Sequence, residues 1–176
     1  MARPVDGPEQ LYSEAAETYG GALERLARAY ERDADKRRDL LQEIHVALWR
    51  SFARFDGRCS IRTWVYRVAH NVATSHVIRA RARPSILIAS EDLESIADSI
   101  DEEHRFDRRR TLDRLYDLIR QLRPIDRQVM LLYLEEVDAA SIAEITGLTA
   151  GNVATRIHRI KKVLTRRFHE TVADHD

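Results

Sequence analysis

The C-terminal third of the chain contains polar side chains that are spaced to contact double-stranded DNA. Between residues 138 and 164, Gly147 separates two runs of helical periodicity, because glycine readily adopts the positive φ that ends a helix. Thr149 then stands where the second helix needs an N-cap. Two short helices joined in this way form a helix-turn-helix, whose second helix enters the major groove. Cations and small polar groups suited to phosphates and base edges occur there at Asn152, Thr155, Arg156, Arg159 and Lys162.

A solvated amphipathic helix in a bundle is the simplest alternative, because it would carry the same basic side chains. The apolar residues of this helix recur every three or four positions, so they form one buried face. Ala143 in the first helix, Gly147 in the turn and Val153 in the second give the pattern that close crossing of two short helices requires. That pattern favours the helix-turn-helix. The expected buried face consists of Val153, Ile157, Ile160, Leu164 and Phe168.

A second group of residues, between positions 61 and 83, has the composition of a surface that binds unpaired bases. Aromatic faces stack on bases at about 1–3 kcal/mol each, arginines neutralise phosphates, and asparagine hydrogen-bonds a base edge. The preceding Asp56-Gly57 pair predicts a loop in which an extruded base fits. The alternative is that Trp64 and Tyr66 belong to the core and the arginines form an ordinary basic helix end. The interleaved residues are Trp64, Tyr66, Arg67, His70, Asn71, His76, Arg79, Arg81 and Arg83, and the expected buried face is Ile61, Val65, Val68 and Val72.

Helical periodicity extends along the whole chain, and the four prolines fall where it stops. Residues 84–107 are rich in Ser, Asp and Glu, which predicts a flexible acidic linker. The expected fold class is therefore all-α. Two small helical domains, over residues 8–83 and 108–170, are joined by this linker, and the second domain is the helix-turn-helix. The individual helices ahead of the helix-turn-helix are expected over about 8–30, 36–55, 61–83, 112–122 and 125–136.

Charge and cysteine content restrict the class of protein. The 29 Lys and Arg residues balance 29 Asp and Glu residues, so the molecule as a whole has no attraction to nucleic acid. We therefore expect weak DNA binding by the chain alone and stronger binding when a partner adds contacts. A single cysteine, Cys59, excludes an internal disulfide, and no apolar run approaches the roughly 20 residues of a membrane span. The expectation is a cytoplasmic protein without a metal or cofactor.

Three segments, in this order, resemble the extracytoplasmic-function (ECF) sigma factors, which are two-domain bacterial transcription initiation factors. Residues 39–49, which begin Asp-Leu-Leu-Gln-Glu-Ile and end Leu-Trp, are similar to the family's helix that docks on the coiled coil of the polymerase β′ subunit. Residues 61–71, Ile-Arg-Thr-Trp-Val-Tyr-Arg-Val-Ala-His-Asn, resemble its promoter-melting helix and are the most specific of the three. Residues 127–164 look like the domain that reads the minus thirty-five element and touches the β flap.

The resemblance implies roles for individual residues. The loop at 55–60 would hold a flipped base of the minus ten element, Asn71 would contact a base near it, and Thr149 would lie near phosphates of the minus thirty-five element. The implied partners are core RNA polymerase, promoter DNA and an anti-sigma factor. The residues implied for the minus ten element are Phe55, Asp56, Gly57, Arg58, Ser60, Arg67, His70, Asn71, Arg79 and Arg81, and those for core polymerase are Asp39, Gln42, Glu43, Val46 and Trp49.

Other classes of function make different predictions. A stand-alone helix-turn-helix regulator, with an N-terminal domain that senses a ligand or dimerises, would bind a palindromic duplex without polymerase. A purely protein-binding adaptor would have no DNA affinity even at low salt. An enzyme is not indicated, because His70 and His76 do not share a helix face as an i, i+4 metal pair would, and the sequence has no phosphate-binding glycine loop.

Overall fold

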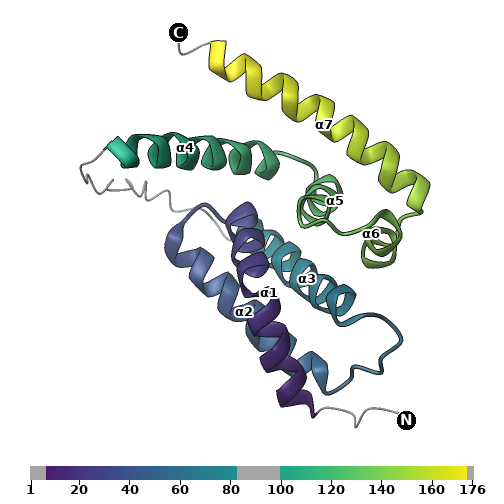
Figure 1. The fold of residues 1–176 in the computed structure, drawn as a ribbon. Coiled ribbons are helices and arrows are strands. Elements are labelled where there is room, and N and C mark those ends of the chain that lie inside the picture. Colours follow the sequence, from purple (N-terminus) through teal and green to yellow (C-terminus); the bar gives the residue numbers. More distant parts are fainter. Residues whose placement is uncertain (1–6, 83–99, 174–176) are drawn as a thin grey trace.

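The structure is a computed structural model that describes residues 7–82 and 100–173, with side chains over 7–80 and 108–170. Its regular elements in these ranges are all helices, as expected from the sequence (Figure 1). Most of the predicted linker at 84–107 lies outside the described residues, but a helix begins inside that segment, earlier than predicted. In chain order the helices are α1 (Pro8–Tyr30), α2 (Ala34–Phe52), α3 (Ile61–Ala82), α4 (Ile100–Arg120), α5 (Pro124–Leu134), α6 (Ala139–Thr146) and α7 (Ala150–Ala173).

Helices α1, α2 and α3 pack around a shared core in the lower half of Figure 1. Each contributes fully buried aliphatic side chains, among them Leu23, Ile44 and Val65. Helix α1 begins at Pro8, whose missing amide hydrogen would have had no partner in the first turn of a helix. Asp33 caps α2 by accepting hydrogen bonds from two backbone amides of its first turn. Local capping and apolar periodicity therefore explain where these helices begin and what they bury.

Helices α4 to α7 form the second group, and α6 and α7 are the predicted helix-turn-helix. Gly147 ends α6 at a φ of 74°, the left-handed conformation expected of it. The hydroxyl of Thr149 accepts a hydrogen bond from the amide of Asn152 at 3.3 Å, as expected of the N-cap of α7. Asp138, which the sequence did not single out, caps α6. Val153, Ile160 and Leu164 on the predicted apolar face of α7 are buried.

The two groups of helices contact each other through α1 and α3 on one side and α4, α5 and α6 on the other. Arg25 donates two hydrogen bonds of 2.7 Å to the carboxylate of Glu135, and Arg62 donates to the backbone carbonyl of the same residue. Arginine–carboxylate pairs with two parallel bonds fix orientation as well as distance. The two groups therefore adopt one defined arrangement. Further contacts join Arg28 to Asp113, Arg67 to Glu144 and Arg120 to the carbonyl of Arg28, and Arg127 lies over the ring of Tyr30.

The buried face of α3 differs from the predicted one. Val65 is buried as expected, but Val68 and Val72 are only half-buried. The interior positions are instead filled by Tyr66, Ala69, His70 and Ala73. The reason is that α3 contacts α5 and α6 as well as α1 and α2, so it is covered on more than one side. A count of aliphatic residues along one stripe cannot detect the second covering layer.

The substitution Glu135→Gln should loosen the contact between the two groups of helices. It keeps the shape of the side chain but removes the charge that Arg25 pairs with, and charge-assisted hydrogen bonds are about twice as strong as neutral ones. We expect a larger radius of gyration in small-angle X-ray scattering at physiological ionic strength. Glu24→Gln makes the same charge change at an exposed position of α1 and should leave the radius unchanged. Equal radii for the two variants would contradict this expectation and mean that the other contacts hold the two groups of helices together without the Arg25–Glu135 pair.

Candidate nucleic-acid interface

The polar face of α7 is accessible at its N-terminal end. Asn152, Thr155 and Lys162 are exposed, and the cap at Thr149 leaves the start of the helix facing solvent. Backbone amides at a helix N-terminus favour an anion such as a DNA phosphate. The turn that precedes α7 therefore presents phosphate-binding and base-binding groups on the same side of the helix-turn-helix.

The two arginines of this face are tied to a buried carboxylate. Arg156 donates to Asp126 of α5 at 2.6 Å, and Arg159 donates to the same carboxylate at 3.3 Å. The side chain of Arg156 is 23% exposed and that of Arg159 is 54% exposed, so only Arg159 projects well into solvent. Burial by itself would raise the pKa of Asp126, but hydrogen bonds from Arg156 and Arg123 outweigh it and hold that pKa below its usual value. The carboxylate is therefore ionised at neutral pH.

The loop before α3 is held by its own side chains. Gly57 has a φ of 73°, and Asp56 accepts a hydrogen bond from the amide of Arg58 and pairs with its guanidinium at 3.0 Å. Ser60 accepts from the amide of Thr63 at the start of α3. The ring of Phe55 lies 5.3 Å from that of Trp64, centre to centre, in an edge-on arrangement. Phe55 and Trp64 are thus partly buried packing residues that border the loop.

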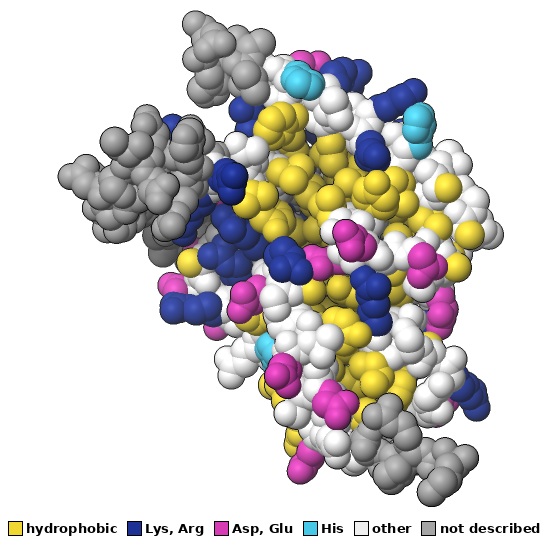
Figure 2. Space-filling model, in the orientation of Figure 1, with side chains coloured by type: hydrophobic (Ala, Val, Ile, Leu, Met, Phe, Trp, Pro, Cys, Tyr) yellow, Lys and Arg dark blue, Asp and Glu magenta, His cyan; other side chains and the backbone are white. Residues whose placement is uncertain are grey.

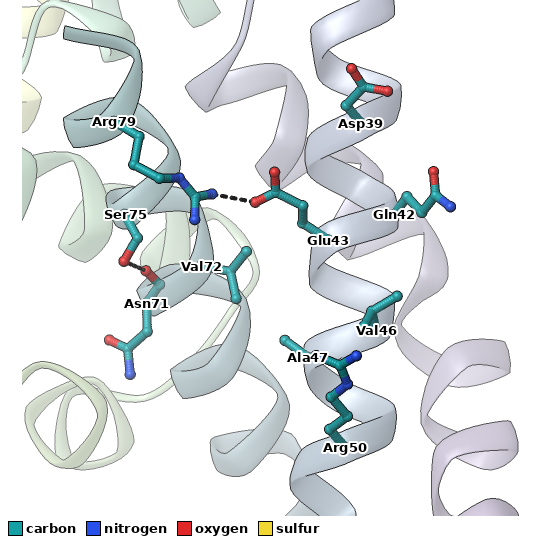
Figure 3. A pocket seen from close by; sticks show the side chains of 10 residues that line it. All are labelled: Asp39, Gln42, Glu43, Val46, Ala47, Arg50, Asn71, Val72, Ser75 and Arg79. Carbon is teal, nitrogen blue, oxygen red and sulfur yellow. Dashed lines mark hydrogen bonds and ion pairs between the residues drawn. The ribbon is translucent and has the colours of Figure 1, made fainter. Parts of the chain in front are cut away.

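One groove brings four of the five residues expected to bind core polymerase, all except Trp49, beside two residues expected to bind the minus ten element. It has a volume of about 730 Å³ and lies between α2 and α3 (Figure 3). Asn71 of α3 is one of the lining residues, although its amide group points away from α2, and Arg79 crosses the groove to pair with Glu43 of α2 (Figure 3). The remaining lining residues are Asp39, Gln42, Val46, Ala47, Arg50, Val72 and Ser75.

Arg67 of α3, whose side chain is 35% exposed, is paired within the chain in this arrangement. It donates to both the carboxylate, at 3.1 Å, and the backbone carbonyl of Glu144 on α6. A residue expected to bind the minus ten element therefore contacts the helix-turn-helix of the same chain. Arg81 lies where no side chain is described.

His70 occupies a different place from the one expected. It is 1% exposed, and its Nδ1 lies 3.1 Å from the hydroxyl of Tyr30 in the core. Burial lowers the pKa of His70 to about 3, so the ring is neutral at physiological pH. A neutral buried ring cannot line a strand-opening surface here, which corrects the expectation. The sequence missed this because histidine occurs both in cores and on surfaces.

Sequence reasoning missed the carboxylates that hold the basic residues. Asp126 lies 30 residues from Arg156, and Glu144 lies 77 residues from Arg67. Asp126 sits in the first turn of α5, two residues after Pro124, where an acidic residue is common for local reasons. No local signal marked either carboxylate, because each pairing depends on how the helices pack.

Apolar side chains remain exposed on both groups of helices. Trp49 and Val46 on α2 are 52% and 41% exposed. In the second group, Figure 2 shows hydrophobic side chains gathered on the surface between α4 and α7, beside several Lys and Arg side chains. A further groove of about 400 Å³ lies among α5, α6, α7 and the turn that joins α5 to α6. Its lining includes Tyr133, Val137 and Ile157. Exposed apolar surface of this kind marks contacts with other proteins.

The described residues form neither a metal cluster nor a membrane span. Within the ranges that the structure covers, no cluster of three or more His, Cys, Asp or Glu side chains is arranged to hold a metal ion. Among the same residues, no helix combines the length and apolar character that crossing a membrane requires.

Each of the two groups of helices matches a known protein family. Residues 15–83 match the family Sigma-70 region 2, and residues 112–164 match Sigma-70, region 4. The RNA polymerase sigma-H factor of Pseudomonas aeruginosa is 28% identical over 144 residues, which cover 76% of this chain and 74% of that protein. The ECF RNA polymerase sigma-E factor of Haemophilus influenzae is 28% identical over 138 residues, covering 74% and 73%. The ECF RNA polymerase sigma factor SigW of Bacillus subtilis is 21% identical over 174 residues, covering 93% and 92%.

The solved structure of CnrH in complex with the cytosolic domain of CnrY shares the fold. It superposes with a TM-score of 0.68 at 20% identity, covering 94% of this chain and 92% of that one. Regions 2 and 4 in this order define a sigma factor. The chain belongs to the ECF sigma factors, and it directs RNA polymerase to promoters.

The burial of His70 predicts a loss of stability in acid. The pKa of His70 is about 3 in the folded protein and about 6.5 in the unfolded chain, so only the unfolded chain binds the proton between these values. The free energy of unfolding should therefore fall as the pH drops below about 6.5, by up to about 1.4 kcal/mol per pH unit from this group. Urea denaturation at a series of pH values measures it.

His70→Gln should reduce that slope, because glutamine does not titrate. His169→Gln, which changes an exposed histidine on α7, should keep the wild-type slope. A wild-type slope in the His70→Gln variant would contradict the assignment of a buried neutral ring.

Proposed function

We propose that residues 8–83 bind core polymerase and open the minus ten element, and that residues 108–170 read the minus thirty-five element. The observation that carries this proposal is the groove between α2 and α3, where Asp39, Gln42, Glu43 and Val46 line one side and Asn71 and Arg79 the other. A surface that binds polymerase beside one that binds the parted strand is what promoter opening requires.

The exposed face of α2 supports docking on the polymerase β′ coiled coil. An aromatic side chain surrounded by polar residues is typical of the residues that dominate binding energy at interfaces. Trp49 and Val46 provide the apolar centre, and Asp39, Gln42 and Glu43 provide the polar and acidic rim. This arrangement fits a partner surface that is apolar at its centre and basic at its edge.

The loop at 55–60 and the exposed face of α3 are proposed to hold the minus ten element. Gly57, Arg58 and Asp56 are exposed, and the partly buried Phe55 forms the floor next to them. Arg67 has to leave Glu144 before it can contact DNA. We therefore propose that the two groups of helices separate when the protein joins polymerase and promoter.

We propose two more partners. The groove among α5, α6 and α7, lined by Tyr133, Val137 and Ile157, is suited to the polymerase β flap because it is apolar and lies on the helix-turn-helix domain. An anti-sigma factor is proposed because the similar protein CnrH was solved in complex with the cytosolic domain of CnrY. Co-purification from the native cell tests for such a partner.

Run-off transcription with core polymerase tests the proposed division of roles. On genomic fragments that the wild-type protein selects, Asn71→Ala should reduce permanganate reactivity of the opened strand about tenfold or more, because it removes a hydrogen bond to a base edge. Capture of the closed duplex should remain. The control Gln10→Ala removes an exposed amide from α1 and should retain full opening.

The same assay separates this function from a stand-alone regulator. Wild-type protein that binds a palindromic duplex without polymerase, and never redirects where transcripts begin, would overturn the proposal. Full opening by Asn71→Ala would reject only the assigned role of that residue.

Trp49→Ala should weaken binding to core polymerase. An aromatic anchor at an interface contributes more than about 1.4 kcal/mol, so the dissociation constant should rise about tenfold or more. Leu112→Ala removes a side chain that is 47% exposed on α4, away from this face, and should bind as the wild type does. Fluorescence anisotropy with labelled protein measures both, and equal affinities would contradict docking through α2.

A further inference from the structure

Asp126 of α5 joins three arginines, two from α7 and one from the position just before α5. Its carboxylate accepts hydrogen bonds from Arg123 at 2.9 Å, from Arg156 at 2.6 Å and from Arg159 at 3.3 Å. Arg156 and Arg159 belong to α7, whereas Arg123 precedes α5. The side chain of Asp126 is 7% exposed. One buried negative charge therefore connects the helix that is expected to enter the major groove to the helix behind it.

The three arginines are held to different degrees. Arg156 makes the shortest bond and is the least exposed, and its Nε is buried without a hydrogen-bond partner. Arg159 and Arg123 are largely exposed, so their remaining N–H groups point to solvent. One carboxylate leaves the charge of two of the three guanidinium groups uncompensated. The cluster can therefore still attract an anion, although each guanidinium has a partner within the protein.

This geometry favours an orienting role over simple masking of charge. A carboxylate can mask arginines from DNA only if it lies at the surface, because there it occupies the N–H groups that a phosphate would otherwise bind. Asp126 instead lies behind the arginines, on the side of the domain interior. From there it restricts the orientation of two long and flexible side chains, which lowers the entropy that they lose when they bind.

We propose that Asp126 is a positioning residue, which orients Arg156 and Arg159 so that α7 can discriminate the minus thirty-five sequence. The inference rests on the proposed function of residues 108–170. Asp126 would thus determine sequence specificity from a position outside the DNA-facing surface. Asp126 itself does not touch DNA.

The test compares specific with non-specific binding by the complete holoenzyme. Selection from random duplexes with the wild-type holoenzyme supplies the upstream element, and a scrambled version supplies the reference probe. Asp126→Asn should lower the ratio of the two affinities about tenfold, the scale of one well-oriented arginine–base contact. Affinity for the scrambled duplex should stay equal or rise, because a negative charge is lost.

Glu170→Gln is the matched control. It removes the same charge from an exposed i, i+4 pair with Arg166 on α7. It should therefore shift both affinities alike and preserve their ratio. If Asp126→Asn also preserved the ratio of specific to non-specific affinity while raising both affinities, Asp126 would only mask charge and the proposal would be overturned.

Asp126→Glu keeps the test decisive if the Asn variant loses its helical circular dichroism. Glutamate retains the charge but displaces the carboxylate by one methylene, so discrimination should fall while non-specific affinity stays at the wild-type level. Wild-type discrimination in this variant would contradict positioning. Failure of the wild-type holoenzyme to select any upstream element would instead reject the proposed function of residues 108–170.

Discussion

Pairing between arginines and carboxylates of the same chain is the interaction on which the rest of this structure depends. Among the described residues, each arginine expected to contact DNA already pairs with a carboxylate of the chain: Arg58 with Asp56, Arg67 with Glu144, Arg79 with Glu43, and Arg156 and Arg159 with Asp126. The more exposed pairs, those of Arg58, Arg67 and Arg79, contribute only about 0–1 kcal/mol each, so an anion can replace the carboxylate, whereas Asp126 is buried behind its arginines. The free chain therefore keeps its basic side chains ordered while its net charge of zero limits attraction to random DNA.

The pairs differ in what they do because they differ in burial and in the elements that they join. The Arg67–Glu144 pair joins α3 to α6, so it links the surface proposed for the minus ten element to the helix-turn-helix. The Arg25–Glu135 pair holds the same two groups of helices from α1. The pairs of Asp126 lie within the second group and survive its separation from the first. A partner that separates the two groups would thus expose Arg67 without disturbing the recognition helix.

Much of the fold follows from local rules that the sequence displays. Pro8 and the apolar repeat set the observed bounds of α1, Gly147 ends α6 with a positive φ, and Thr149 caps α7. The motifs at residues 39–49, 61–71 and 127–164 were sufficient to indicate the family. Two expectations failed for different reasons. The start of α4 falls inside an acidic segment with few apolar residues, so no apolar stripe marked it. Helix α3 is covered on more than one side by other helices, so its buried face extends beyond the predicted stripe.

By itself, the sequence determined that the chain is helical, the glycine end of α6, the cap of α7 and the chemistry of the two candidate surfaces, because each depends on residues within one or two helical turns. Only the tertiary structure decided that His70 is buried and neutral, that Val46 and Asn71 share a groove, and that Asp126 anchors the recognition helix. These features join residues that are tens of positions apart. Their energies arise from desolvation and from hydrogen bonds across helices, which no local pattern of residue types encodes.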